Sequence, residues 1–273
     1  MKTKLFLIFL ICIGINVKSQ NLRSIVKAKG ADKPQLFQMP TTEDEYNYMV
    51  NYQSTLAEGA DIKKGYSIVN NKDKLTFGKY SFKFISLFRS NNSFAGLIVK
   101  AHSDASGKDL WYGIPFKNKV LFKNFCNKIA NYDEAMAKAF LSAFVTFICE
   151  NPDQATTESE YKYMTTGYRN HSKDGSLKDG YKIDNTESKT IKIKGSYSDC
   201  TFTFMPLMRE DNSCAGTIVK LFSDGIINGG TYYYGIPNST GELLNKFISD
   251  KAKQDAMISL AFLQGYIQYA LEN

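Results

Sequence analysis

The segment NSFAGLIVK at residues 92–100 returns as NSCAGTIVK at residues 212–220, with seven of nine positions identical. In both copies a polar Asn-Ser pair precedes an apolar, β-rich run that ends on a lysine. Such a pair closes a tight turn through hydrogen bonds to its own backbone, and the run after it is typical of a hairpin strand. A segment repeated at this length predicts that one folding unit occurs twice in the chain.

Other matching segments flank this one, in the same order in both halves of the 273-residue chain. They are Thr42–Met49 with Thr157–Met164, Gly65-Tyr66 with Gly180-Tyr181, Ser103-Asp104 with Ser223-Asp224, Tyr112–Pro115 with Tyr234–Pro237, and Glu150-Asn151 with Glu272-Asn273. The offset between partners grows from 115 to 122 residues, so small insertions fall between the blocks, where loops belong. We therefore expect a leader or linker at residues 20–40 and two tandem units at 41–151 and 152–273.

Each unit begins with a capping-box pattern, in which Thr42 or Thr157 is followed three residues later by a glutamate. We expect a first helix to run from there to about Leu56 in one unit and Tyr168 in the other. Four β-rich runs follow in each unit, joined by short polar clusters that suit antiparallel hairpins. These runs are Gly65–Val69, Tyr80–Phe88, Ala95–His102 and Leu110–Ile114, and then Tyr181–Ile183, Cys200–Met208, Ala215–Phe222 and Thr231–Ile236.

Two helices are expected to close each unit. Pro115 and Pro237 end the last strand, because proline cannot donate to a sheet ladder. Apolar residues then recur at helical spacing, beginning at Val120 and Leu243. The final helix is apolar on most faces and must be buried on more than one side, against its own sheet and the other unit. The predicted fold is α+β, with a helix, about four antiparallel strands and two C-terminal helices packed on the sheet in each unit.

Residues 1–19 have the three parts of a secretory signal peptide. Two lysines open the chain, an apolar run from Leu5 to Ile15 follows, and small side chains precede a cleavage point between Ser19 and Gln20. The apolar run is shorter than the roughly 20 residues that a membrane-spanning helix needs. We therefore expect an exported protein, periplasmic or extracellular, without a transmembrane span.

The charge of the chain argues against nucleic acid as a partner. The full sequence has 34 basic and 27 acidic residues, a net charge of +7. Cleavage would remove Lys2, Lys4 and Lys18, leaving 31 basic residues and a net charge of about +4. The basic residues are spread along the chain, whereas phosphate binding needs a concentrated basic face. An acidic glycan or an anionic membrane surface stays compatible with this balance.

No metal, cofactor or catalytic triad is predicted. A site used in both units should appear in both, yet His102 aligns with Phe222, and His171 lies in a region that varies between the units. With only these two histidines, a histidine metal site or a Ser-His-Asp triad is disfavoured.

Four cysteines remain after cleavage, at Cys126, Cys149, Cys200 and Cys214. An exported protein can form disulfides, and four cysteines allow three pairings. Each cysteine aligns with an apolar or aromatic residue of the other unit, which favours buried thiols that act as small hydrophobic side chains. Both interpretations stay open at this point.

Polar residues present in both units offer an enzyme interpretation. Lys100, Ser103 and Asp104, near Arg89, supply the residue types of a base, a nucleophile and an orienting acid. A structural interpretation is simpler, because Ser-Asp pairs cap hairpin turns and basic residues keep sheet edges soluble.

Aromatic and basic residues shared by the units are the candidate binding residues, since tyrosine and tryptophan bury much area with little loss of entropy. They are Trp111, Tyr112, Tyr233, Tyr234, Arg89, Arg209, Lys100 and Lys220. We expect the four aromatic residues to line a cleft or sheet face between the units. The expected function is a non-enzymatic binding protein of the cell envelope, whose partner is a macromolecule, glycan or envelope component. The alternatives are a hydrolase or transferase with an unrecognised site, and a structural or assembly subunit.

Overall fold

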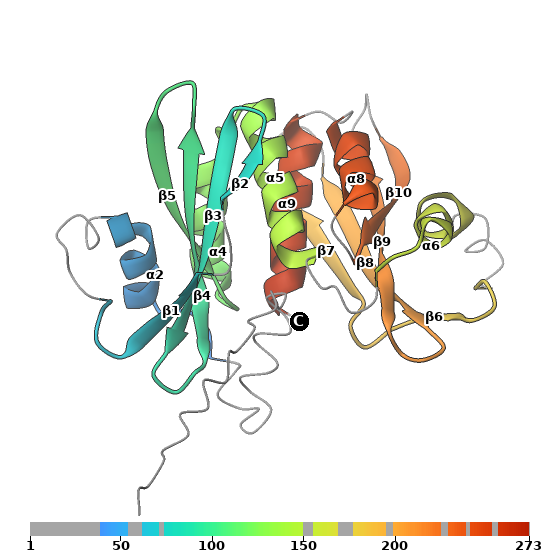
Figure 1. Ribbon diagram of the computed structural model, residues 1–273, viewed down its shortest axis with the longest axis horizontal. Coiled ribbons are helices and arrows are strands. Elements are labelled where there is room, and N and C mark those ends of the chain that lie inside the picture. The colour runs from blue at the N-terminus through green and yellow to red at the C-terminus, as the bar shows by residue number, and fades with distance from the viewer. Residues whose placement is uncertain are drawn as a thin grey trace, which may run out of the picture.

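The computed structural model describes residues 39–53, 62–70, 74–149, 155–168, 177–194, 199–224, 229–238, 241–252 and 256–272. Within these residues it has six α-helices and two antiparallel sheets of five strands each (Figure 1). The predicted α+β class is therefore confirmed. The expected signal peptide and most of the expected leader lie outside the described residues. None of the helices described is long and apolar enough to cross a membrane.

The two halves have the same order of elements. The first half consists of α2 (Glu43–Val50), β1 (Tyr66–Asn70), β2 (Leu75–Phe77), β3 (Tyr80–Arg89), β4 (Phe94–Ser103), β5 (Lys108–Pro115), α4 (Lys119–Ile129) and α5 (Glu134–Cys149). The second half consists of α6 (Glu158–Lys162), a π-helical turn (Tyr163–Gly167), β6 (Tyr181–Ile183), β7 (Lys189–Ile193), β8 (Cys200–Arg209), β9 (Cys214–Ser223), β10 (Gly230–Pro237), α8 (Glu242–Ala252) and α9 (Ala256–Glu272).

The strand order is also the same in both sheets. The first sheet has the order β1-β3-β4-β5 and the second β6-β8-β9-β10. Each sheet has a fifth, short strand. In the first sheet β2 pairs with the start of β3, and β1 pairs with its end. In the second sheet β7 and β6 border β8 in the same way. A register shift interrupts the central hairpin at Leu87/Phe88 and at Leu207/Met208. The sequence predicts four strands per unit and misses these two short ones.

The central hairpins turn on an asparagine with a left-handed backbone. Asn92 and Asn212 both have φ of 63°. Asparagine tolerates this region better than most residues. The turn is closed by the backbone N–H of Arg89, which donates to Ser93 O at 2.9 Å, and Arg209 repeats the bond to Ser213 at 2.8 Å. The predicted hairpin is therefore confirmed in both halves.

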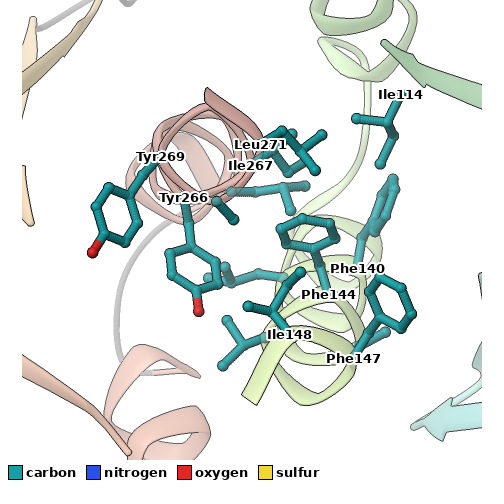
Figure 2. Packing of buried hydrophobic residues seen from close by; sticks show 14 of the residues in the cluster. Ile114, Phe140, Phe144, Phe147, Ile148, Tyr266, Ile267, Tyr269 and Leu271 are labelled. Atoms are coloured by element: carbon teal, nitrogen blue, oxygen red, sulfur yellow. The ribbon is translucent and has the colours of Figure 1, made fainter. Parts of the chain in front are cut away.

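The layers follow from the apolar faces of the helices. Figure 1 shows α5 and α9 side by side in the middle, a sheet on either side of them, and α2 and α6 on the far faces of the sheets. On one side Phe140 of α5 stacks on Phe82 of β3 with ring centroids 5.1 Å apart. Between the halves, the ring of Phe144 meets that of Tyr266 edge-on at 5.9 Å, and Figure 2 shows the side chains that fill this space. The last helix of each unit is thus buried on two sides, as predicted.

Glycine lets α2 lie close against the strands of its sheet. Gly96 has φ of +148°, and a Cβ there would come within 2.8 Å of both Ile114 O and the Met49 side chain. Gly216 repeats this arrangement against Met164. The Ala-Gly pair of the repeated segment therefore marks the point at which the first helix of each half packs on the sheet.

The apolar face of α4 differs from the one that the sequence spacing predicts. The spacing places Val120 on the apolar face of its helix, but this side chain is 72% exposed. Helix α4 instead faces the core with Leu121, Phe125 and Ile129, which repeat every four residues.

Candidate functional site

Arg89 and Arg209 each hold a buried ion pair at the end of a long strand. Arg89 Nε and Nη2 donate to the two carboxylate oxygens of Glu45, both at 2.6 Å. Arg209 repeats this with Glu160 at 2.6 and 2.8 Å. The side chains of Arg89 and Glu45 are only 11% and 3% exposed. Both arginines were candidate binding residues, and the structure gives each of them a contact that ties the first helix to the hairpin.

The same carboxylate completes the capping box. Thr42 N–H donates to Glu45 Oε2 at 2.8 Å, and Glu45 N–H donates to the Thr42 hydroxyl at 3.2 Å. Burial of Glu45 opposes its ionisation, but hydrogen bonds from Arg89 and Thr42 outweigh this, so the pKa of the carboxyl lies below its usual value. Glu45 is therefore held as a carboxylate in the folded protein.

The four candidate aromatic residues do not share one surface. Trp111 lies on the face of the first sheet that carries α2, where its ring centroid is 5.8 Å from that of Tyr52. Tyr112 points to the opposite face and meets Tyr132 at 5.9 Å. Neighbouring residues of a strand point to opposite faces, so Trp111 and Tyr112 cannot line one cleft.

The second half repeats this division. The ring of Tyr233 contacts that of Tyr168 at 6.0 Å, and the ring of Tyr234 contacts Phe262 of α9, also at 6.0 Å. Helices α5 and α9 occupy the space between the sheets (Figure 1). The expected common cleft between the units is therefore wrong, whereas a binding role for any one of these residues stays a prediction.

A recess that charged side chains border lies instead on the face of the first sheet that carries α2, which we call the outer face. The recess has a volume of about 350 Å³. Its lining residues are Lys74, Ser81, Phe82, Lys83, Lys100, His102 and Asp109. The strand register explains the grouping, because Lys83 lies directly opposite Lys100, and His102 lies opposite both Ser81 and Asp109. Lys100 is thus the one candidate from the sequence that lines the recess.

Asp109 organises the charges of the recess. Its two oxygens lie 2.7 Å from His102 Nδ1 and 2.8 Å from Lys100 Nζ. The hydrogen bonds with Lys100 and then with His102 lower the pKa of the Asp109 carboxyl. The Lys100 ammonium also lies 5.5 Å from the ring centroid of Trp111, so one side chain joins the carboxylate to the aromatic ring.

The recess has part of the geometry of nucleophilic catalysis. Ser81, His102 and Asp109 are neighbours across three strands, and the His102–Asp109 contact has the form of a base and its orienting acid. Within the described residues, however, Ser81 Oγ makes no hydrogen bond, and His102 Nε2 faces Asp104 Oδ1 at 3.5 Å. A nucleophile needs a hydrogen bond to its base, so the triad is not assembled.

The catalytic group suggested by the sequence is not assembled either. Arg89 lies six residues along β3 from Lys83, the partner of Lys100. At about 3.3 Å per residue, the Cα atoms of Arg89 and Lys83 are about 20 Å apart. The Ser103 carbonyl accepts the backbone N–H groups of Ser106 and Gly107 in the turn after β4. Ser103 and Asp104 therefore belong to a hairpin turn, as the structural interpretation holds.

The equivalent face of the second sheet has a different chemistry. Thr203 stands opposite Lys220, where the first sheet has Lys83 and Lys100. Phe222, 48% exposed, stands in the position of His102, and Thr231 stands in the position of Asp109. A site that must appear in both units cannot include His102 or Asp109, because the second sheet has Phe222 and Thr231 in their places. Only the strand register shows that Lys83, His102 and Asp109 share one face.

The cysteines and possible metal ligands show no further site in the part of the chain that the structure describes. Cys126, Cys200 and Cys214 carry thiols and form no disulfide there. The side chain of Cys149 lies outside the described residues. Among the described residues, no group of three or more His, Cys, Asp or Glu side chains could hold a metal ion.

Comparison with known proteins gives no relative: no family model, no curated protein and no solved structure matches the chain.

Proposed function

We propose that this chain is an exported, non-enzymatic protein of the cell envelope that binds its ligand on the outer face of the first sheet. The observation that carries the proposal is the recess of about 350 Å³ lined by lysines, a histidine and an aspartate. Its size falls within the range of small-ligand sites, and its polar groups converge from three neighbouring strands. The signal-like residues 1–19 support export.

The contrast between the two halves supports this location. Residues that fix the fold, such as the Glu45–Arg89 and Glu160–Arg209 pairs, are the same in both halves. The outer faces differ where His102 is replaced by Phe222. Since both sets of residues fit the same sheet, the fold does not require the charged set. This difference supports a ligand as the reason for the charged set on the first sheet.

The test compares the mature chain, residues 20–273, with a variant in which Lys83→Thr, His102→Phe and Asp109→Thr are combined. These changes install the residues of the second sheet, so the variant is expected to fold. Envelope polysaccharide and membrane fractions of the source organism are incubated with each protein and sedimented. We expect the wild-type protein to sediment and the variant to stay in solution. Equal sedimentation of both, or of neither, would contradict the proposal.

The alternatives make different predictions in the same material. A hydrolase that uses Ser81 would release soluble product from the polysaccharide and would lose this activity in Ser81→Ala. An assembly subunit would elute from size-exclusion chromatography as an oligomer. N-terminal sequencing of the protein secreted from the full chain should begin at Gln20, and an intact Met1 would contradict export by cleavage.

A further inference from the structure

Like charges face one another across the recess. Lys83 of β3 lies directly opposite Lys100 of β4. Lys74 precedes β2, whose first residue pairs with the neighbour of Lys83, so a third lysine continues the row. Like charges directly opposite in a sheet are destabilising. The second sheet has no such row, because Thr190 and Thr203 occupy the corresponding places and their hydroxyls lie 3.2 Å apart.

Among the described residues, two of these lysines have no counter-ion. Lys100 pairs with Asp109 at 2.8 Å. Within the described part of the chain, Lys74 and Lys83 have no carboxylate within ion-pair distance, although both line the recess. The recess therefore carries a net positive charge, which an oxyanion would neutralise.

A buried hydroxyl in the recess also lacks a partner among the described residues. Ser81 is 1% exposed, and its Oγ makes no hydrogen bond with any described residue. A buried hydroxyl without a partner costs free energy, so such groups are normally satisfied by protein, water or ligand. Ser81 lines the recess beside His102 and can donate to a ligand oxygen there.

Asp109 adds an acceptor to these donors. Its carboxylate accepts from Lys100 and His102 and retains lone pairs for further donors. A ligand that matches the recess therefore presents an oxyanion to the lysines and hydroxyl groups to Asp109. A sulfate ion would match the first requirement and not the second, and a phosphate ion would offer Asp109 only its one or two P–OH groups.

We infer that the recess binds a sugar acid, a ligand that combines a carboxylate with several hydroxyl groups, either free or as a residue of an acidic polysaccharide. The inference rests on the proposed function and names the ligand class of the same site. Lys74 and Lys83 contact the carboxylate, Ser81 donates to it, and Asp109 accepts from a hydroxyl. The recess of about 350 Å³ has room for one such residue.

The test is an NMR titration of the ¹⁵N-labelled mature chain with glucuronate and galacturonate, and with glucose and galactose as neutral counterparts. Inorganic phosphate and polygalacturonate are further arms, which separate a simple anion and a polymer from the free sugar acid. We expect a sugar acid or its polymer to shift the amide signals of β3, β4 and β5. The neutral sugars should leave these signals in place, and phosphate should bind more weakly.

The Lys83→Thr variant separates a ligand contact from a structural role. It should weaken sugar-acid binding about tenfold or more, because one charge-assisted hydrogen bond is lost. Its Tm should stay the same or rise, because the repulsion with Lys100 is removed. Lys192→Thr is the matched control, since Lys192 lies opposite Thr201 on the second sheet, outside the recess. It should bind as the wild type does.

Three outcomes would overturn the inference: equal binding of neutral sugars, unchanged affinity in Lys83→Thr, or signal shifts confined to other elements. If envelope material still sediments the wild-type protein and sugar acids neither bind nor compete, the ligand class is wrong and the binding function stands. If sugar acids bind through Lys83 but no envelope fraction binds the protein, the ligand site is confirmed and the proposed envelope partner is wrong.

Discussion

Replacing Arg89 with methionine should destabilise the protein strongly, although the residue lies at the end of a strand. The substitution removes two hydrogen bonds of 2.6 Å to Glu45 and leaves that carboxylate, 3% exposed, without its cation. Arg89 also donates to Phe94 O and Pro40 O, each at 3.0 Å, so two carbonyls lose a donor. Removing one partner of a buried pair costs about 3–5 kcal/mol, because the other charge stays buried.

The assay is thermal and urea unfolding of the mature chain and its variants. For a folded chain of this size, about 2–4 °C of Tm is lost per kcal/mol, so Arg89→Met should lower the Tm by roughly 6–20 °C. The double variant Glu45→Gln/Arg89→Met should lose less than Arg89→Met alone, because no unpaired charge remains. Arg209→Met is the matched variant in the second half. A loss below about 1 kcal/mol, the range of an exposed ion pair, would refute the reasoning.

The pH dependence of this loss of stability gives an independent check on the ion pair between Arg89 and Glu45. The pKa of Glu45 is lowered in the folded state from its ordinary value of 4.5. A lowered carboxyl pKa contributes stability that is complete above the unfolded value and is lost as the pH falls through the folded value. The difference between wild type and Arg89→Met should therefore be largest above about pH 4.5 and shrink below it. A difference that grows on acidification would contradict the ion-pair account.

Two further changes test the packing. Phe144→Ala removes a fully buried ring that meets Tyr266 across the two halves, and it should cost about 3–5 kcal/mol in urea unfolding; a loss under about 1 kcal/mol would show that this contact does not join the halves. Burial raises the pKa of the Cys126 thiol to about 12, so iodoacetamide at pH 8 should modify it slowly in the native protein and rapidly in urea, as followed by mass spectrometry. Rapid native modification would contradict the burial of this thiol.

The sequence predicts most of the fold because local signals and the repeat agree. The capping boxes at Thr42 and Thr157 form as expected, with the glutamate side chain returning to the backbone in both. Strand β7 (Lys189–Ile193) alternates between exposed and more buried residues and could have been predicted, whereas β2 is hidden in the sequence for a physical reason. β2 contains only Leu75, Thr76 and Phe77, and three residues are too few to show an alternation.

The candidate site was less predictable because it depends on register. Lys83, His102 and Asp109 are separated along the chain and share a face only once β3, β4 and β5 are aligned. The residues common to both units include Arg89 and Arg209, which form buried ion pairs that stabilise the fold. The residues that line the recess, such as His102 and Asp109, differ between the halves and therefore do not belong to this common set.

The central contact joins the two halves with the symmetry of a dimer. Phe144 and Tyr266 are 122 positions apart, the offset of the repeat at this point, so equivalent residues meet each other. Self-matching contact is the mark of two identical molecules related by a two-fold axis. Either half alone would expose its last apolar helix to water, so α5 and α9 each supply the cover that the other helix needs.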